Sequence, residues 1–241
     1  MAGHDIGFPG ERDPAVFGQL LRALSDEAEL VRVEDAVARV KAGQVVDHPV
    51  IAFTFDDGFL ECYQHLAPAL HDVGVNAAFF INTRYVDASP DSIERFNRRV
   101  NSPGRLPMSS TMVAELADEG FVIGAHTGDH QRLDTADPAV LSDQIVMGRT
   151  EVEEITGKPC PWFAWPFGTY NDMCDASIAV ALDTYDTVFS SACNEQYSSH
   201  RGKILNRRHF EVYWPASHVR YFLRQPRVWE EGSPPSLTNH S

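Results

Sequence analysis

The 241-residue sequence contains few cysteines and no long hydrophobic run. Its four cysteines, Cys62, Cys160, Cys174 and Cys193, are far apart and form no Cys-x-x-Cys pair, which argues against a zinc knuckle or a thioredoxin-like site. We interpret them as small core residues of a protein from a reducing compartment. No apolar stretch approaches the roughly 20 residues that a membrane-spanning helix requires, so we expect no membrane span.

Basic residues are also scarce, because 20 Lys and Arg stand against 34 Asp and Glu, giving a formal net charge of −14. A phosphate backbone is bound by clustered Lys and Arg, so we expect no nucleic-acid partner. The first 17 residues lack the apolar segment behind a basic head that marks a secretory signal, and we therefore expect a cytoplasmic protein. With 43% hydrophobic residues, the chain can bury a substantial core. The sequence does not define an oligomeric state.

We expect one domain over residues 1–241, with a loose Pro/Ser-rich tail at 230–241. Short apolar runs alternate with helical patterns that end at glycine. They predict strands at 50–55, 77–81, 121–123, 162–165, 187–189 and 203–205, and helices at 60–73, 109–116, 140–156 and 178–182. This alternation implies an α/β fold of parallel strands, and by itself it does not distinguish a barrel from an open sheet. No strand is recognisable before Phe17, from which we expect that a preceding segment is missing.

Two adjacent carboxylates, Asp56 and Asp57, follow the first predicted strand within the segment Thr-Phe-Asp-Asp-Gly. Functional residues of α/β enzymes gather just past the carboxyl ends of strands. Neighbouring carboxylates repel each other, which destabilises the fold unless a cation or hydrogen bonds compensate. Asp-Gly is also a common turn dipeptide, so this pair taken alone favours a simple turn.

Two histidines, His126 and His130, follow the third predicted strand within His-Thr-Gly-Asp-His. Histidines four residues apart can share a metal ion, but as an isolated feature they are more simply explained as exposed loop residues. Together with Asp57, the histidines favour a metal site over exposed loop residues. Two histidines and one carboxylate leave coordination positions open, as a catalytic divalent site requires. Such a ligand set suits zinc first, and then cobalt, nickel or manganese.

An aromatic segment, Phe-Ala-Trp-Pro-Phe-Gly-Thr-Tyr, ends the fourth predicted strand and continues beyond it. Pro166 and Gly168 fix a tight loop around Phe167 and let a substrate approach the backbone closely. Trp165 and Tyr170 offer flat apolar faces of the type that pack on sugar rings. We predict that four residues of this segment contact the substrate: Trp165, Pro166, Gly168 and Tyr170. Ordinary core aromatics beside a turn are the alternative interpretation.

Taken in order over residues 50–168, the three segments resemble the motifs of the polysaccharide deacetylase family (carbohydrate esterase family 4, the nodulation-factor deacetylase homology domain). The resemblance implies a distorted (β/α) barrel with fewer than eight regular repeats. It implies that Asp57, His126 and His130 bind a divalent metal, and that Asp56 is the general base. It also implies that the backbone N–H of Phe167 stabilises the oxyanion, a role that does not depend on the side chain.

Two positions depart from the family pattern. Many members have an arginine that orients the catalytic base two residues before the proline of the third motif, where this chain has Ala164. Members also have a late Leu-x-His whose histidine is the general acid, whereas this chain has Arg207 two residues after Leu205. We predict that Arg207 or Arg208 replaces the missing arginine, and that His209 or a water molecule replaces the acid. Surface charges after a last strand are an equally good interpretation.

Arginines gather between the second predicted strand and the helix at 109–116, at positions Arg84, Arg95, Arg98, Arg99 and Arg105. A charged sugar, or a sugar carried on a nucleotide diphosphate or lipid phosphate, would suit such a segment. A helix at 92–100 with arginines on its solvated face is the simpler interpretation.

The leading functional prediction is a metal-dependent hydrolase that removes an N-acyl group, acetyl in the first instance, from an amino sugar. Because no secretory signal is recognisable, we expect the substrate to be a sugar precursor of a surface polysaccharide. One alternative is a related amidohydrolase that acts on a formamide or a cyclic amide with the same water and base. Another is a sugar-binding protein on an inactive version of the fold, against which the presence of Asp56 argues, since metal binding does not require it.

Overall fold

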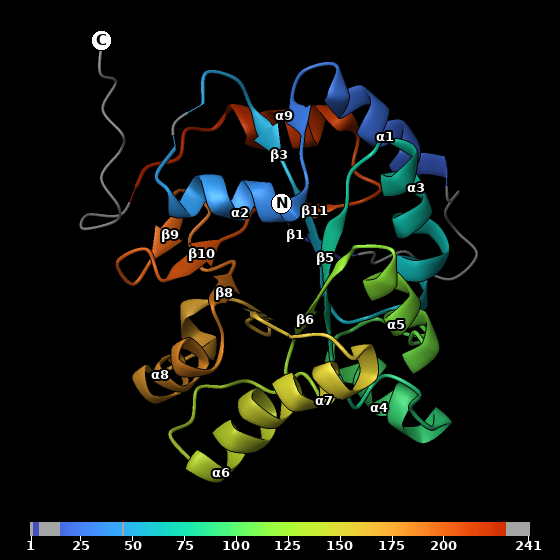
Figure 1. Cartoon of the computed structure of the whole chain (residues 1–241), viewed down its shortest axis with the longest axis vertical. Helices are drawn as coiled ribbons and strands as arrows, with labels where there is room; N and C mark the ends of the chain where they lie inside the picture. The colour runs from blue at the N-terminus through green and yellow to red at the C-terminus, as the bar shows by residue number, and fades with distance from the viewer. Residues whose placement is uncertain (1, 5–14, 45, 230–241) are drawn as a thin grey trace.

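The computed structural model describes residues 2–4, 15–44 and 46–229 and shows an α/β chain built around one curved sheet (Figure 1). Nine strands form the sheet in the order β11-β1-β4-β5-β6-β7-β8-β10-β9. Their bounds are β1 Ala2–His4, β4 Phe53–Phe55, β5 Ala77–Ile81, β6 Val122–Ala125, β7 Trp162–Ala164, β8 Thr187–Ser190, β9 Ser198–Ser199, β10 Ile204–Asn206 and β11 His209–Glu211. Neighbouring strands are parallel except β9 and β10, as the alternating pattern of the sequence predicts.

The segment that contains β10 and β11 brings the two edges of the sheet together. β10 pairs with β8 near one end of the sheet, and β11 pairs with β1 at the other end. Only Arg207 and Arg208 separate β10 from β11, and consecutive Cα atoms are about 3.8 Å apart. The sheet therefore curls until β8 and β1 come close together. The result is the distorted (β/α) barrel with fewer than eight regular repeats that the motifs predict.

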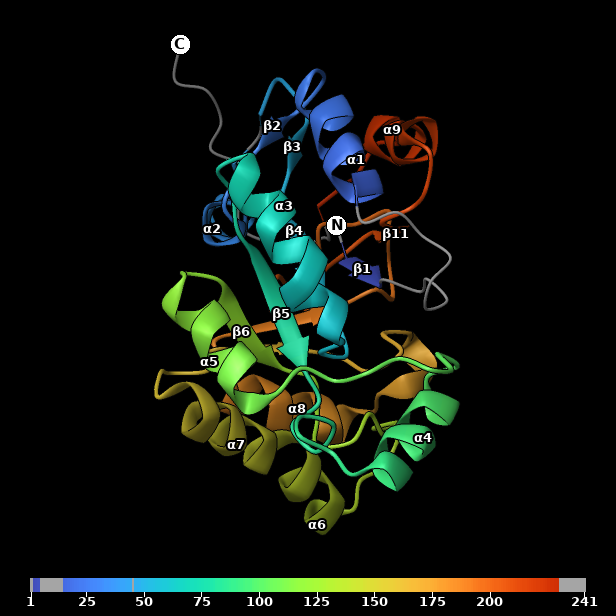
Figure 2. The ribbon, with the colours of Figure 1, turned by 90° about the vertical axis from the view of Figure 1, so that its right-hand side faces the viewer.

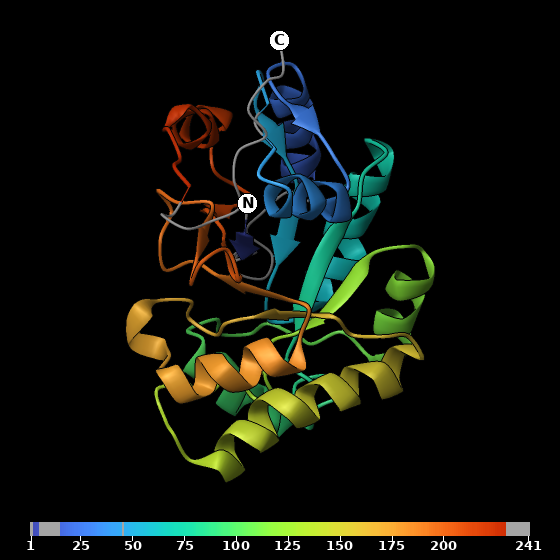
Figure 3. The same ribbon diagram turned by 60° about the vertical axis from the view of Figure 1, so that its left-hand side comes forward.

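Helices cover the outside of the barrel, and α3, α5, α7 and α8 follow one another around the strands (Figure 1). α1 and α9, from opposite ends of the chain, lie side by side (Figure 2), and α8 runs alongside the η2–α7 helix (Figure 3). The bounds are α1 Ala15–Ser25, η1 Cys62–Leu66, α3 Ala67–Asp72, α4 Pro90–Arg99, α5 Ser110–Asp118, α6 Pro138–Leu141, η2 Ser142–Val146, α7 Met147–Thr156, η3 Tyr170–Asp172, α8 Asp175–Thr184 and α9 Ala216–Arg224. Ser109 caps α5, and Gly157 ends α7 in the left-handed conformation, as the sequence predicts.

Helix α2, Val33–Lys41, closes the amino ends of the barrel strands. The backbone N–H of Val33 donates to Oδ1 of Asn76, just before β5, over 2.9 Å. At the other end of the helix, Nζ of Lys41 donates to the carbonyl of Asp186, just before β8, over 2.8 Å. Val33 and Val37 pack on apolar residues of the barrel interior, which include Phe80, Ala164, Phe189 and Leu205. The carboxyl ends of the strands therefore remain as the end of the barrel that can hold a site.

Two details of the predicted elements are wrong. The strand predicted at 50–55 is divided, because Val50–Ile51 forms β3 and pairs with β2, Glu29–Leu30, in a separate two-stranded sheet, while Phe53–Phe55 enters the barrel. The absence of a strand before Phe17 is also contradicted, because Ala2–His4 pairs with both β4 and β11. Ala-Gly-His has no β-branched residue and no Phe, Tyr or Trp, the residue types that favour strands.

The strand predicted at 77–81 has the same bounds in the structure, and the other predicted strands and helices are present with shifted bounds. The predicted loose tail at 230–241 lies outside the described residues. Within the part of the chain that the structure describes, no helix combines the length and the apolar character needed to cross a membrane.

Candidate metal site

Asp56 and Asp57 leave the carboxyl end of β4 in a buried turn. Each residue is only 4% exposed. Asp57 and Gly58 both have a φ of 76°, a left-handed conformation that aspartate tolerates better than most residues. A Cβ at Gly58 would lie 3.2 Å from Cγ2 of Ile81, so the turn packs directly on the end of β5. The turn interpretation is therefore correct for the backbone, but a simple surface turn would not bury two carboxylates.

His126 and His130 reach the same place from the carboxyl end of β6. Nε2 of His126 lies 3.6 Å and Nε2 of His130 lies 3.4 Å from Oδ1 of Asp57. One ligand atom from each of the three residues can be chosen so that all lie within 4.8 Å of one another. Atoms that share one tetrahedral zinc ion at about 2.0–2.1 Å are about 3.3 Å apart. The spacing therefore fits a single divalent ion.

A second contact of His126 fixes the orientation of its ring. Nδ1 lies 2.7 Å from the backbone carbonyl of Ala164, the last residue of β7. A carbonyl only accepts hydrogen bonds, so the network assigns the ring proton to Nδ1 and leaves the lone pair on Nε2. That lone pair is on the nitrogen nearer to Asp57, as a metal ligand requires.

The electrostatics of Asp57 also favour a bound cation. Burial, and then the charge of Asp56, raise the pKa of Asp57 well above its usual range, while Arg105 and Arg207 act in the opposite direction. A buried carboxylate next to another is unfavourable in its charged form unless a cation compensates. The donor types, their spacing and their burial together fit a resident divalent metal.

Arg207 holds the other carboxylate, Asp56. Its Nη1 donates to Oδ1 and its Nη2 to Oδ2, each over 2.7 Å, and Nη1 also donates to Oγ1 of Thr54 over 3.0 Å. A bidentate pair of this kind fixes the plane of the carboxylate and offsets the cost of burying its charge. Oδ2 of Asp56 lies 4.0 Å from Nε2 of His126, which places Asp56 directly beside the three candidate ligands.

Arg208, which the sequence analysis also predicts as catalytic, binds backbone carbonyls of other segments. Its guanidinium donates to backbone carbonyls, at 3.1 Å from Asn194 and 2.9 Å from Gln225, and also contacts the carbonyl of Phe222. Successive side chains of an extended segment point to opposite sides, so only one of two neighbouring arginines can face the barrel interior. Arg208 instead ties the end of α9 to the loop that follows β8.

His209, the predicted replacement for the general acid, is the first residue of β11. Its Nε2 lies 2.8 Å from Oε1 of the buried Glu211, and its ring packs edge-on against Trp214 with 5.7 Å between centroids. Residues two positions apart along a strand lie on the same side, so the strand pattern predicts that His209 shares a side with Arg207. The carboxylate of Glu211 fixes the orientation of the imidazole.

Trp165 belongs to the core rather than to a sugar-binding surface. Its side chain is 1% exposed, and Nε1 donates to the backbone carbonyl of Asp172 over 2.9 Å. The carboxylate of Asp172 accepts from the backbone N–H of Thr169 over 3.0 Å and from the guanidinium of Arg132. These contacts hold the loop after β7 in place, so Trp165 supports that loop rather than presenting a flat face to solvent.

Phe167 presents its ring to the candidate metal site. Its φ is 60°, its side chain is 38% exposed, and its ring centroid lies 4.4 Å from that of His130. The guanidinium of Arg132 lies 4.5 Å from the same ring. The ring of Phe167 is therefore in contact with both a candidate ligand and a surface cation.

The other predicted substrate contacts differ in exposure. Pro166 and Gly168 are buried, and a Cβ at Gly168 would lie 3.0 Å from the backbone nitrogen of Ser191. The close approach that Gly168 permits is thus to the loop after β8. Tyr170 is 55% exposed and remains a candidate for substrate contact.

The arginine-rich segment is largely engaged in pairs within the protein. Arg98 pairs with Glu94, Arg99 with Asp129, Arg84 with Asp143, and Arg105 with Glu61, while Arg95 donates to Ser92. The predicted solvated helix is α4, and its outer face carries Arg95 and Arg98. These contacts do not support a segment reserved for a charged sugar.

Sequence reasoning missed three residues that organise the site: Asp129, Arg132 and Asp172. Each lies inside or close to a recognised motif, and this proximity was the only sequence feature that could have identified it as part of the site. Their partners come from other loops, as in the pair of Arg132 and Asp172, which are 40 residues apart. No periodic pattern marks a contact of that kind.

The fold and the site together define an α/β barrel protein with a buried Asp-His-His set at the carboxyl ends of its strands. A sequence model of the family described as polysaccharide deacetylase matches residues 43–183, which is more than half of the chain. The protein belongs to the polysaccharide deacetylase family, as its three motifs predict.

The chain is similar to several known proteins that are named as deacetylases. A chitin deacetylase from a Pestalotiopsis species is 26% identical over 165 residues, which is 67% of this chain and 47% of that protein, so the chain spans about half the length of this curated relative. The structure of IcaB from Ammonifex degensii matches with a TM-score of 0.69 at 18% identity, over 92% of this chain and 95% of that one. The Streptococcus pyogenes deacetylase PplD, in complex with acetate, matches with a TM-score of 0.69 at 17% identity, over 93% and 96%. At these identities, the two structures establish a shared fold.

Proposed function

We propose that this protein is a metal-dependent hydrolase that removes an N-acyl group, acetyl in the first instance, from an amino sugar of a polysaccharide or of its precursor. The observation that carries the proposal is the buried set of Asp57, His126 and His130 with the arginine-held carboxylate of Asp56 beside it. The family, and the printed names of a chitin deacetylase and of a deacetylase with acetate, support the type of reaction.

In this proposal, Asp57, His126 and His130 hold the metal, with zinc expected first. When bound, a divalent ion supplies Lewis-acid chemistry, polarising the amide carbonyl and lowering the pKa of water. Asp56 is suited to a different task, because Arg207 already engages both of its oxygens. Each carboxylate oxygen has two lone pairs, so an oxygen that accepts from Arg207 can still take a proton from the attacking water.

The remaining steps concern the oxyanion and the leaving amine. The backbone N–H of Phe167 is the proposed donor to the oxyanion, and the contacts of Trp165 and Asp172 hold the loop that carries it. His209, oriented by Glu211, is the proposed donor of a proton to the departing amine. A free amine and a carboxylic acid result, so atoms and charges balance with one water consumed.

The test is acid release from N-acetylated amino sugars and their oligomers before and after metal removal. We expect chelation to abolish acetate release and zinc to restore it, with one metal per chain lost and regained. Unchanged activity after complete metal removal would contradict the mechanism. Preferential release of formate from N-formyl analogues would favour the alternative amidohydrolase, and tight zinc binding without hydrolysis of any acylated sugar would favour a binding protein.

A further inference from the structure

The loop that carries both candidate histidine ligands is strained. Thr127 and His130 have φ values of 69° and 58°. A residue with a side chain persists in that region only where its surroundings hold it there. Some of that support is local, because the backbone N–H of His130 donates to Oγ1 of Thr127 over 3.0 Å. Whatever else holds the loop also sets the relative position of His126 and His130.

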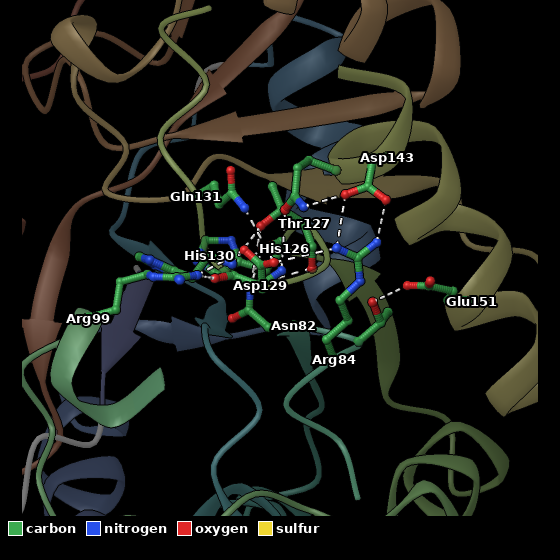
Figure 4. A network of polar contacts seen from close by, with 12 residues as sticks. Asn82, Arg84, Arg99, His126, Thr127, Asp129, His130, Gln131, Asp143 and Glu151 are labelled. Atoms are coloured by element: carbon green, nitrogen blue, oxygen red, sulfur yellow. Dashed lines mark hydrogen bonds and ion pairs between the residues drawn. The ribbon is translucent and has the colours of Figure 1, made fainter. Parts of the chain in front are cut away.

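Asp129, the residue before His130, is the point at which other elements hold the loop (Figure 4). Its Oδ1 accepts from Nη1 of Arg99, in α4, over 2.8 Å, and its Oδ2 accepts from Nη1 of Arg84, in the loop after β5, over 3.4 Å. Nη1 of Arg99 also contacts the backbone carbonyl of Asp129. The backbone N–H of Asp129 donates to Oε1 of Gln144, in η2, over 3.3 Å. Three separate elements thus meet at this one residue.

Arg84 extends the network to the helical layer. It forms a bidentate pair with Asp143, at 2.9 and 2.5 Å, and the Arg84 guanidinium lowers the pKa of that carboxyl (Figure 4). Its backbone N–H donates to the carbonyl of Gly128 over 2.9 Å. A Cβ at Gly128 would lie 3.0 Å from Cζ of Arg84, so the guanidinium packs directly against the loop backbone. Arg84 therefore constrains the loop both by shape and by charge.

We propose that Asp129 is a positioning residue of the metal site, and that its ion pairs with Arg99 and Arg84 hold residues 126–130 so that both histidines meet Asp57. The inference rests on the proposed function, because it takes Asp57, His126 and His130 as the metal ligands. Asp129 is not itself a ligand in this arrangement, since its carboxylate faces two guanidinium groups. It acts through the backbone of the neighbouring His130, in the way that residues behind metal ligands fix ligand orientation.

Two neighbouring arginines of α4 provide a matched test. Arg99 pairs with Asp129, whereas Arg98 pairs with Glu94 four residues earlier on the same helix. We expect Asp129→Asn and Arg99→Gln to weaken zinc binding to the metal-free protein by about tenfold, and Arg98→Gln to change it by less than about twofold. Arg99→Lys should recover most of the affinity, because Arg99 reaches Oδ1 and the backbone carbonyl of Asp129 through the single nitrogen Nη1. The measurement is competition with a chromophoric chelator, supported by the absorption spectrum of the cobalt-substituted protein.

Thermal unfolding of the metal-free variants distinguishes positioning from folding. These pairs are partly exposed, so we expect Arg99→Gln and Arg98→Gln to have similar Tm values while their zinc affinities differ. Wild-type zinc affinity in Asp129→Asn, or equal loss of affinity in Arg98→Gln and Arg99→Gln, would overturn the positioning role. A wild-type protein that binds no zinc, or zinc binding that survives Asp57→Asn combined with His130→Gln, would instead overturn the proposed function.

Discussion

Both oxygens of Asp56 are bonded by the guanidinium of Arg207, which lies 151 residues further along the chain. The position from which the family pattern would supply an orienting arginine is Ala164, and its backbone carbonyl instead accepts from His126. The barrel makes the exchange possible, because the segment carrying Arg207 links β10 to β11 and closes the sheet beside β4 and β1. A group that bonds Asp56 can thus come from the link between the last two strands rather than from the strand of the third motif.

Substitution of Arg207 should lower activity, whereas substitution of its neighbour Arg208 should lower stability. Arg207→Lys keeps the charge but loses the bidentate pair with Asp56, so we expect hydrolysis to fall by about 10- to 100-fold with the metal content unchanged. Arg208→Lys loses bonds to backbone carbonyls, and we expect a lower Tm with a hydrolysis rate within about twofold of wild type. Steady-state acetate release and thermal unfolding of both variants measure this. Equal rate losses in the two would show that the pair with Asp56 has no special role.

The two adjacent carboxylates should respond differently to neutralisation. Asp56→Asn removes the proposed base but no ligand, so we expect a rate loss of about 10²- to 10⁴-fold with zinc retained. Asp57→Asn removes a ligand, and we expect loss of zinc together with activity. Metal content and acetate release, measured on the same preparations, test both expectations. If Asp56→Asn sheds the metal while Asp57→Asn keeps it, the two roles are reversed.

A change of leaving group tests His209. Protonation is needed to expel an amine but not a stable phenolate, so His209→Gln should slow amide hydrolysis by about 100-fold and leave hydrolysis of an activated aryl acetate nearly unchanged. The same comparison for Glu211→Gln shows whether the partner of His209 matters, because its Oε1 lies 2.8 Å from the ring. A wild-type rate on the amide in His209→Gln would remove this residue from the mechanism and leave water as the proton donor.

Substitution of Phe167 tests whether its backbone N–H or its ring is needed for hydrolysis. If the backbone N–H stabilises the oxyanion, Phe167→Leu should keep kcat within a few-fold of wild type, since it preserves the amide. Its KM for oligomeric substrates should rise, because the 38% exposed ring is lost from the mouth of the site. Steady-state kinetics on monomeric and oligomeric substrates separate the two effects. A drop of more than about 100-fold in kcat at full metal occupancy would assign the role to the ring.

Gly124 tests the packing of the barrel interior. A Cβ there would lie 2.5 Å from the ring of Phe80 and 3.0 Å from the carbonyl of Trp162, so we expect Gly124→Ala to destabilise the fold by about 1–3 kcal/mol or more. Gly148→Ala is the matched control, because its nearest neighbour, in Thr127, would be 3.7 Å away and alanine favours a helix by about 0.5–1 kcal/mol. Denaturant unfolding of both variants gives the difference, and equal stabilities would contradict this account of the interior.

The sequence predicted the parts of the site that depend on short spacing. Asp57, His126 and His130 each follow a strand that its apolar residues make recognisable, and parallel strands place their carboxyl ends at one end of the barrel. In the structure, one ligand atom from each of the three lies within 4.8 Å of the others. The alternation of strands and helices likewise predicted the fold class.

The parts that could not be predicted depend on which side of a strand a residue faces. The choice between Arg207 and Arg208 follows from the pairing of β10 with β8, where Asn206 lies opposite Ser190, and Leu-Asn-Arg-Arg-His has no alternation that reveals it. Trp165 is buried in the apolar core, and its Nε1 donates to the carbonyl of Asp172 from a different part of the loop. Both outcomes arise from tertiary contacts that override local preference.

The closing segment of the barrel has a consequence for how relatives of this protein are compared. The match to the family ends at residue 183, before the arginine that bonds Asp56. In a curled barrel sheet, the inward-facing side chains of all strands converge on the same axis. A functional group can therefore be supplied from a different position in the sequence and still reach the same site. If Arg207 does for Asp56 what the expected arginine would do, an alignment of motifs alone records a loss, so members that lack a motif residue are best judged on the full ring of inward-facing positions.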